Sequence, residues 1–416
     1  MAMTHHHKIT LLRNRDVDDP VELTYVESPL RKAQARFSGR RVLTPQIDLG
    51  AYRWASLIDW IDVEFELSRR TQHWKINERI ERLTGRKEYP EALDPDTEAG
   101  NTATRYKLRV QEPDMGLLHR IIDDIKGEYG LVAPAVVKQL EVSIDSYPET
   151  PSEEARARLH GVLVRHFFPT KKVLTDNLRW PRFTPGVRKR KGDYIVARNL
   201  EDPRQDVVDR MTPATDRPPP YESTFYVGEK DDPHVMWRIQ NKTIDKQNKA
   251  TGARLDLTDE EKRVRIEVTL GPEGCREVGL LRFDDLTSFR FTKLQKHFFQ
   301  FMLPTFGAYV AGGAGAHSSA VKHWIEDMRR QRFLNVGVLG LQIREDARED
   351  FRSLEMTNFL SWHKARGSRL PRKQRRGAGP YGTLVAYEEL ARTIERALAG
   401  LQRRVQRELG RQTYGR

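Results

Sequence analysis

LEVSID, residues 140–145, alternates strictly between apolar and polar side chains. Alternation of this kind predicts a β-strand with one apolar and one polar face, and the polar face here carries Glu141 and Asp145. VRIEVTL, residues 264–270, alternates in the same way and places Glu267 opposite its apolar residues. If the two strands are neighbours, one face of their sheet carries several carboxylates.

Further segments with the two-residue period of strands or the 3.6-residue period of helices surround these two strands. Alternating segments predict strands at residues 58–67, 106–111, 138–147 and 262–270, two more joined by a turn within 223–242, and a short hairpin in the loop 180–220. Helical spacing predicts helices at 71–83, 115–130, 153–168, 291–302, 320–333 and 384–409. The order of these elements indicates an α+β fold, with a mixed or antiparallel sheet, helices on one face and an α-rich C-terminal region.

Composition shifts suggest three parts. Residues 1–50 are polar and basic with scattered prolines, which favours a partly disordered arm. Residues 51–280 hold the strand-rich pattern and are expected to form the α+β domain. Residues 281–416 are mainly helical, and we expect them to serve in DNA binding or oligomerisation.

The net charge of the chain indicates which class of partner it binds. Lysine and arginine total 72 against 59 acidic residues, and 72 − 59 gives a formal charge of +13, which favours a polyanion such as nucleic acid. The single cysteine, Cys275, excludes a disulfide framework and a cysteine-based zinc cluster. No apolar run approaches the roughly 20 residues that span a bilayer, and no export signal is evident, so we expect a cytoplasmic protein that does not enter membranes.

The polar strand faces raise a metal hypothesis. MWRIQNK, residues 236–242, places Arg238, Gln240 and Lys242 on one face, which would surround the carboxylates with cations. Carboxylates held on a rigid sheet suit a hard cation such as Mg²⁺ or Mn²⁺. An ordinary antiparallel sheet with a solvated polar side gives the same pattern, and the pattern alone leaves both interpretations open.

Three motifs in the strand-rich region resemble one family. TFYVGEKDDPHVMWRIQNKTIDKQN, residues 224–248, followed by RVRIEVTL, residues 263–270, resembles the Rep_trans family of rolling-circle replication initiators and relaxases. The family pattern is a Tyr-x-Gly strand, an Arg-Ile-Tyr-Asn-Lys strand and an Arg-x-Glu-x-x-Leu strand. LEVSID resembles its upstream acidic strand. Gln240 stands where the family usually has an aromatic residue, and Glu141 stands where it has aspartate.

The resemblance implies a nickase-like sheet and a DNA-nicking reaction. Tyr226 would be the nucleophile, forming a 5′-phosphotyrosine link and freeing a 3′-OH for rolling-circle replication or transfer. Metal ligands for Mg²⁺ or Mn²⁺ would be Glu267, Glu141 and Asp145, and Arg238 and Lys242 would stabilise developing charge.

The implied partners are origin DNA, as duplex and single strand, a host helicase and a second copy of the chain. The alternative for Tyr226 is a strand tyrosine packed at a sheet edge. The nucleophile hypothesis requires Phe225 to point to the opposite, packed face.

Two basic clusters suggest contacts to DNA phosphates. They are Arg188, Lys189, Arg190 and Lys191, and Arg372, Lys373, Arg375 and Arg376. Such runs are also common in solvated loops. If they bind DNA without the proposed chemistry, the chain is a non-catalytic DNA-binding protein, which would keep its function in a chelator.

A tyrosine recombinase is a further alternative. His363 and Arg366 fit a His-x-x-Arg box, and Tyr381 lies downstream. The box specifies two residues in four, so it matches many unrelated sequences by chance.

Overall fold

A computed structural model gives the fold of most of the chain. It describes residues 5–12, 20–32, 34, 37–86, 88–169, 179–184, 209–216, 218–229, 231–247, 254–307, 316–367 and 384–410.

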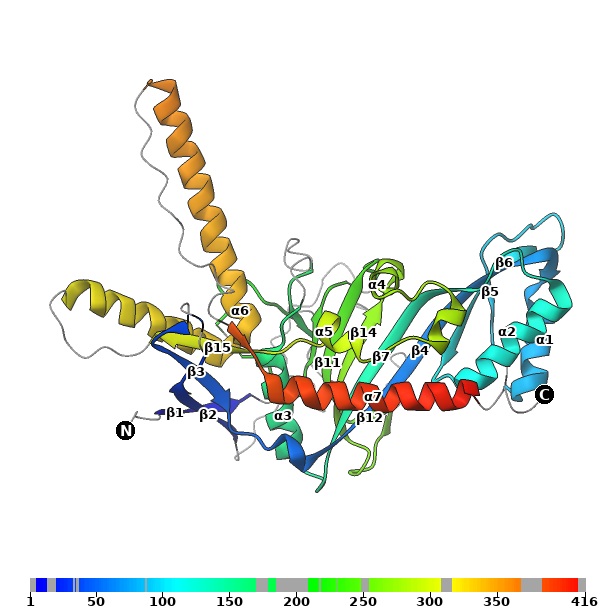
Figure 1. Ribbon diagram of the computed structural model, residues 1–416, viewed down its shortest axis with the longest axis horizontal. Coiled ribbons are helices and arrows are strands. Elements are labelled where there is room, and N and C mark those ends of the chain that lie inside the picture. The colour runs from blue at the N-terminus through cyan, green and yellow to red at the C-terminus, as the bar shows by residue number, and fades with distance from the viewer. Residues whose placement is uncertain are drawn as a thin grey trace.

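The alternating segments form the centre of a nine-stranded antiparallel sheet (Figure 1). Its order is β5 (Glu91–Ala92), β6 (Thr102–Gln111), β4 (Tyr52–Gln72), β7 (Val136–Pro148), β14 (Arg263–Leu270), β11 (Val235–Lys242), β10 (Thr224–Val227), β8 (Arg182–Thr184) and β9 (Asp209–Arg210). The strands predicted from alternation are confirmed, and β7 and β14 are neighbours. Long β4 runs further in both directions than its alternating core, residues 58–67, indicates.

One face of this sheet is apolar and packs against helices. On β4, Ile61, Val63 and Phe65 are all buried, as their alternation requires. On β11, the indole nitrogen of Trp237 donates to the carbonyl oxygen of Phe298 at 2.6 Å. The helices against this sheet include α3 (Glu153–His166), α4 (Pro272–Val278), α5 (Lys293–Phe298) and α7 (Glu388–Gly410). The α+β architecture predicted from the sequence is confirmed.

Two further helices close the far end of the sheet. Helices α1 (His73–Thr84) and α2 (Met115–Tyr129) pack on one another, and Arg79 of α1 pairs with Asp124 of α2 at 2.7 Å. Helices therefore form at both predicted places, although residues 71 and 72 still belong to strand β4 and Gly130 follows the end of α2. Within the described residues, no helix is long and apolar enough to cross a membrane.

A second antiparallel sheet joins the two ends of the chain. Its order is β1 (His5–Leu11), β2 (Val21–Pro29), β3 (Arg40–Pro45), β15 (Met302–Gly307) and β16 (Leu384–Ala386). The arm that we expected to be partly disordered thus contains three strands. The inward residues Leu23 and Tyr25 of β2 are buried, and β15 supplies the partner edge for β3 from more than 250 residues away.

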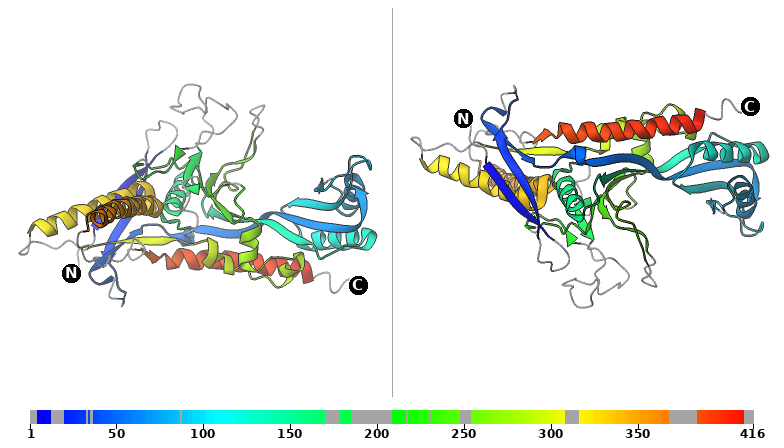
Figure 2. Two further views of the ribbon diagram at one scale, coloured as in Figure 1. Left: turned by 90° about the horizontal axis from the view of Figure 1, so that it is seen from above. Right: turned by 90° about the horizontal axis from the view of Figure 1, so that it is seen from below.

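The C-terminal region is less separate than its composition suggests. Helix α7 runs along the central sheet and packs on β4 (Figure 2). Helix α6 (Ala316–Ala365) is kinked at Gly337, and its second half projects away from the body (Figure 1). The helix predicted at 291–302 ends at Phe298, since Met302 begins strand β15. The other elements named within the described residues are the hairpin of β12 (Ile244–Gln247) and β13 (Arg254–Asp256) and the 3-10 helices Leu49–Ala51 and Phe283–Thr287.

Candidate active site

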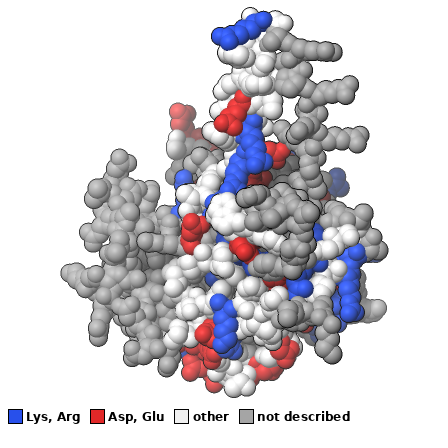
Figure 3. All heavy atoms as spheres, turned by 90° about the vertical axis from the view of Figure 1, so that its left-hand side faces the viewer, with Lys and Arg blue, Asp and Glu red and all other residues white. Residues whose placement is uncertain are grey.

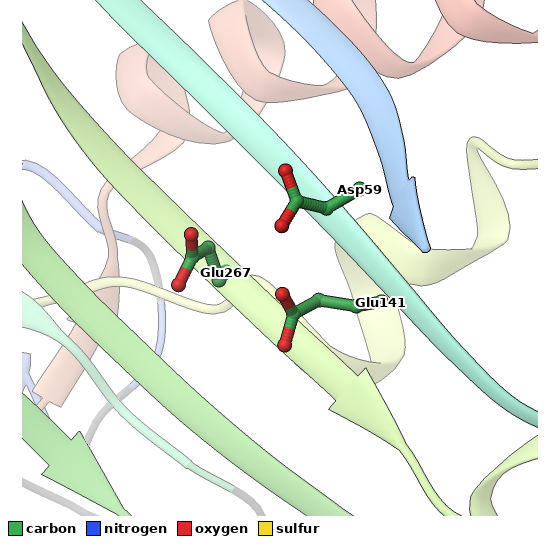
Figure 4. Close-up of side chains that lie close together, drawn as sticks. All are labelled: Asp59, Glu141 and Glu267. Atoms are coloured by element: carbon green, nitrogen blue, oxygen red, sulfur yellow. The ribbon is translucent and has the colours of Figure 1, made fainter. Parts of the chain in front are cut away.

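The polar face of the central sheet brings three carboxylates together (Figure 4). Oxygen atoms of Asp59, Glu141 and Glu267 all lie within 4.8 Å of one another. Glu141 and Glu267 are 4% and 1% exposed, and Asp59 is half-buried. We call these three residues the carboxylate cluster. Converging carboxylate oxygens are the donors that hard divalent cations prefer, so this cluster could hold a metal ion.

Strand register explains how Glu141 and Glu267 meet. Glu267 of β14 faces Ser143 of β7, and Glu141 faces Thr269 of β14. The two glutamates therefore lie on adjacent strands and on the same face, two residue positions apart along the strands. The hydroxyl of Thr269 donates to Glu141 and orients its carboxylate.

Asp59 joins the cluster through an irregularity that alternation does not reveal. The register of β4 against β7 shifts between Ile58 and Trp60, so Asp59 is an extra residue in the strand. The alternation of Ile61 and Val63 would place Asp59 on the apolar face. The β-bulge turns its side chain to the polar face instead. A lone aspartate at an apolar position of a strand was the signal available in the sequence.

Asp145 lies on the predicted face but not in the carboxylate cluster. It is 1% exposed, and Arg265 on the facing strand position binds both its oxygens at 2.5 and 2.7 Å. Arg263 lies 3.0 Å away and the hydroxyl of Tyr147 donates to Asp145 at 3.2 Å. Asp145 therefore positions Arg265, and it is not among the residues whose carboxylate oxygens converge in the cluster.

Two arginines contact the carboxylate cluster. Arg238 on β11 pairs through Nε with Glu267 and lies 3.6 Å from Glu141. Arg265 places Nη1 3.0 Å from Asp59 and 3.6 Å from Glu267. The polar face is therefore a buried ion-pair network and not the solvated side of an ordinary sheet. The side chain of Arg238 is 28% exposed, whereas that of Arg265 is 2% exposed.

Burial and neighbouring charges shift the protonation of this network. Loss of solvent raises the pKa of Glu141 and Asp59 raises it further, although Arg238 and the Thr269 hydroxyl act in the opposite direction. Burial lowers the pKa of Lys242, and the cations Arg265 and Arg263 lower it further. Burial and the neighbouring Asp59 thus make the ionised form of Glu141 costly, and a bound cation would offset that cost.

Tyr226 lies in the same row of the sheet as Glu267. Tyr226 of β10 faces Arg238 of β11, and Arg238 in turn faces Glu267 of β14. These three facing positions share one face of the sheet. Two strand spacings separate Tyr226 from Glu267, which is about 10 Å across the sheet. On its other side Tyr226 faces Arg182, whose guanidinium lies 5.2 Å from the tyrosine ring centre.

The neighbours of Tyr226 agree with the sequence prediction. Phe225 is 1% exposed and points to the packed face, where its ring lies 5.1 Å from Phe183 and 6.3 Å from Phe167. Gly228 has a φ of 87°, and a Cβ there would lie 2.7 Å from the carbonyl oxygen of Val235. The glycine of the Tyr-x-Gly motif is therefore required by the close approach of β10 and β11.

The other predicted site residues are placed as follows. Lys242 ends β11 opposite Arg263, and Gln240 donates to Glu267 at 3.2 Å. The basic clusters 188–191 and 372–376, and Tyr381, lie outside the described residues. His363 lies in the last turn of α6 and Arg366 directly follows the helix, at the projecting end and away from the carboxylate cluster (Figure 1), so the structure lends the recombinase hypothesis no support.

Comparisons with protein-family models, with curated proteins and with solved structures returned no match. The functional proposal therefore depends on the geometry of the site together with the motifs at residues 224–248 and 263–270.

Proposed function

We propose that this chain cleaves one DNA strand through Tyr226, with a divalent cation held by the carboxylate cluster. The supporting observation is the row of facing residues Tyr226, Arg238 and Glu267 on one sheet face. A nucleophile, a cation and a carboxylate are thereby held on rigid strands within about 10 Å. The reaction would serve replication initiation or strand transfer of the rolling-circle type, as the resemblance to the Rep_trans family implies.

The reaction is a transesterification. The phenolic oxygen of Tyr226 attacks the phosphorus of one phosphodiester, and the bond from phosphorus to the 3′ oxygen breaks. The phenol loses its proton and the departing 3′ oxygen gains one, so a 3′-OH and a 5′-phosphotyrosine form. One phosphodiester replaces another, which keeps the step reversible when the 3′-OH attacks in turn.

The cluster fits a hard cation, and we propose Mg²⁺ or Mn²⁺. All three side chains offer oxygen, the donor that these ions prefer. Beside them the hydroxyl of Ser143 is buried and finds no hydrogen-bond partner within the described residues. A bound cation would withdraw charge from the scissile phosphate.

The charges of the network suggest how Arg238 and Lys242 take part. Four carboxylates face four cations on this part of the sheet: Asp59, Glu141, Asp145 and Glu267, with Arg238, Lys242, Arg263 and Arg265. A divalent cation would leave an excess of two positive charges, which two DNA phosphates would balance. Arg238 is the most exposed of the three arginines, so it is best placed to exchange Glu267 for a phosphate oxygen.

A second function rests on the same charges. Because the arginines already neutralise the carboxylates, the network can act as a structural ion-pair system in a non-catalytic DNA-binding protein. In that case the sheet face would hold its shape without a metal. Metal dependence and covalent attachment separate the two functions.

The test is covalent trapping on single-stranded oligonucleotides. The purified chain is mixed with a labelled random library and Mg²⁺ or Mn²⁺, and adducts that survive denaturing electrophoresis are quantified. We expect metal-dependent adducts that Tyr226→Phe abolishes and that Tyr89→Phe, a change at a 75% exposed loop tyrosine, leaves intact. Retained DNA binding with no adduct under any metal would favour the non-catalytic function.

A further inference from the structure

The second half of helix α6 exposes an unusually large number of apolar side chains for a helix that is surrounded by solvent. Six large apolar side chains between residues 351 and 362 are 36–61% exposed. They are Phe351, Leu354, Met356, Phe359, Leu360 and Trp362. Residues 338–343, directly after the Gly337 kink, are still buried against the body, and beyond them the helix projects into solvent (Figure 1). A concentration of exposed apolar side chains on a projecting helix marks an interaction surface.

Helical spacing places four of these side chains on one stripe. At 100° per residue, Phe351, Leu354 and Trp362 fall within one third of the helix circumference, with Phe359 at its margin. The aromatic rings are concentrated at the far end, where the guanidinium of Arg366 lies 4.1 Å from the ring centre of Trp362. Such a stripe has the width of a helix–helix contact.

Charge is distributed unevenly along the same helix. Residues 345–350 contain four acids and one arginine, whereas residues 363–366 contain a histidine, a lysine and an arginine and no acid. Burial together with Asp350, Glu345 and Glu349 raises the pKa of Asp346 to about 6, so this acidic segment carries internal repulsion. Figure 3 shows lysine or arginine atoms at the tip of the projection and acidic atoms nearer its base. The two ends of the helix are therefore complementary to each other.

We propose that residues 344–366, the projecting part of α6 and the residue that follows it, pair in antiparallel orientation with the same residues of a second copy of this chain. A two-fold axis near Met356 would bring the acidic segment 345–350 of each copy beside the basic tip of the other. The same arrangement would bury the apolar stripes against one another over about 34 Å of helix. A parallel pair would instead place acid against acid, so the charge pattern selects the antiparallel one. This inference does not depend on the nicking reaction.

The experiment measures self-association of the full-length chain by sedimentation velocity across a concentration series. We expect the wild type to form a dimer. Phe359→Ser combined with Trp362→Ser should weaken the dimer by roughly a hundredfold or more, because two large apolar side chains no longer become buried on association. Trp74→Ser is the matched control: Trp74 is a 43% exposed tryptophan on helix α1, and its replacement should leave the association unchanged. Circular dichroism confirms that each variant is folded.

Charge reversal tests the orientation. Asp346→Lys with Asp350→Lys should weaken the dimer, and Lys364→Glu with Arg366→Glu should do the same, because each double variant brings like charges together at both ends of an antiparallel pair. The chain carrying all four changes should recover the affinity, since its two ends are again complementary. In a parallel pair the four changes would only exchange one like-charge contact for another.

Three results would overturn these claims. A wild type that stays monomeric at every concentration would overturn the proposal, as would a dimer that the aromatic variant leaves unchanged. If the variant with all four substitutions dimerises as weakly as the two double variants, the antiparallel arrangement is overturned.

Discussion

Replacing Glu267 with glutamine removes one negative charge from the carboxylate cluster and keeps the shape of the side chain. Glu267 is 1% exposed and contacts Arg238 and Arg265. Alternation alone predicts that this change leaves the fold intact, because it places Glu267 on a polar face outside the core. In the structure that face is buried, so the variant leaves Arg238 and Arg265 with one carboxylate partner fewer. We therefore expect the variant to be less stable than the wild type.

The size of the effect follows from the exposure of each arginine. Removing one partner of a fully buried ion pair costs roughly 3–5 kcal/mol. Arg238 is 28% exposed and can turn toward water, and Arg265 keeps Asp145 and Asp59. We therefore expect a decrease of about 2 kcal/mol in the free energy of unfolding, or about 2 °C in Tm for a chain of this length.

The metal response is the sharper measure. A cation present at about ten times its Kd stabilises the folded wild type by about 1.4 kcal/mol. This stabilisation by Mg²⁺ or Mn²⁺ should disappear in Glu267→Gln, together with metal-dependent cleavage. Glu64→Gln is the matched control, because Glu64 lies on the same sheet face but pairs with Arg105 and Lys138, outside the cluster. A Glu267→Gln variant that keeps the full metal-induced shift in Tm and full cleavage would refute a metal site there.

Three other changes test neighbouring parts of the account. Burial lowers the pKa of His160 and of His166 to about 3, so both are neutral when folded and protonate only on unfolding as the pH falls below their ordinary value. Protonation of each histidine in the unfolded chain should therefore lower the free energy of unfolding by about 2 kcal/mol between pH 6.5 and 5. In urea denaturation, the stability of His160→Gln should depend less steeply on pH than that of the wild type. Gly228→Ala should cost about 2 kcal/mol or more, whereas Gly85→Ala, also at positive φ but with open space around it, should cost about 1 kcal/mol in the same thermal assay. Neutralising the basic residues of 372–376 should reduce the slope of log affinity against log salt by roughly 0.7 for each single-strand phosphate that the segment neutralises, with cleavage of a saturating oligonucleotide unchanged; an unchanged slope would make this segment a solvated loop.

Local patterns predict the central sheet well because each strand has one buried apolar face. The alternation of Ile61, Val63 and Phe65 and of the two acidic strands follows directly from that constraint. The motifs also single out Tyr226 and Glu267 as candidate site residues. Strand order then adds what alternation cannot: β14 lies between β7 and β11, so the glutamates become neighbours and Tyr226 joins their row.

The missed features depend on contacts that no local pattern records. Asp59 reaches the cluster because of a β-bulge in β4. Asp145 lies outside the cluster and binds Arg265 on the facing strand. Strands of the N-terminal arm are stabilised by β15, which lies more than 250 residues later. Which strands pair across so many residues of sequence depends on the complete fold. The periodicity of either segment alone does not reveal it.

The most direct test of the central claim is to locate the DNA-linked residue by mass spectrometry. Trapped adduct is digested with nuclease and trypsin, and the peptide of residues 211–230, which holds both Tyr221 and Tyr226, is fragmented. Tyr221 is 1% exposed and its hydroxyl donates to Glu153, which makes it an internal control. We predict a nucleotide phosphate on Tyr226 and none on Tyr221. A nucleotide on any other residue, or unmodified Tyr226 in every trapped adduct, would contradict Tyr226 as the nucleophile.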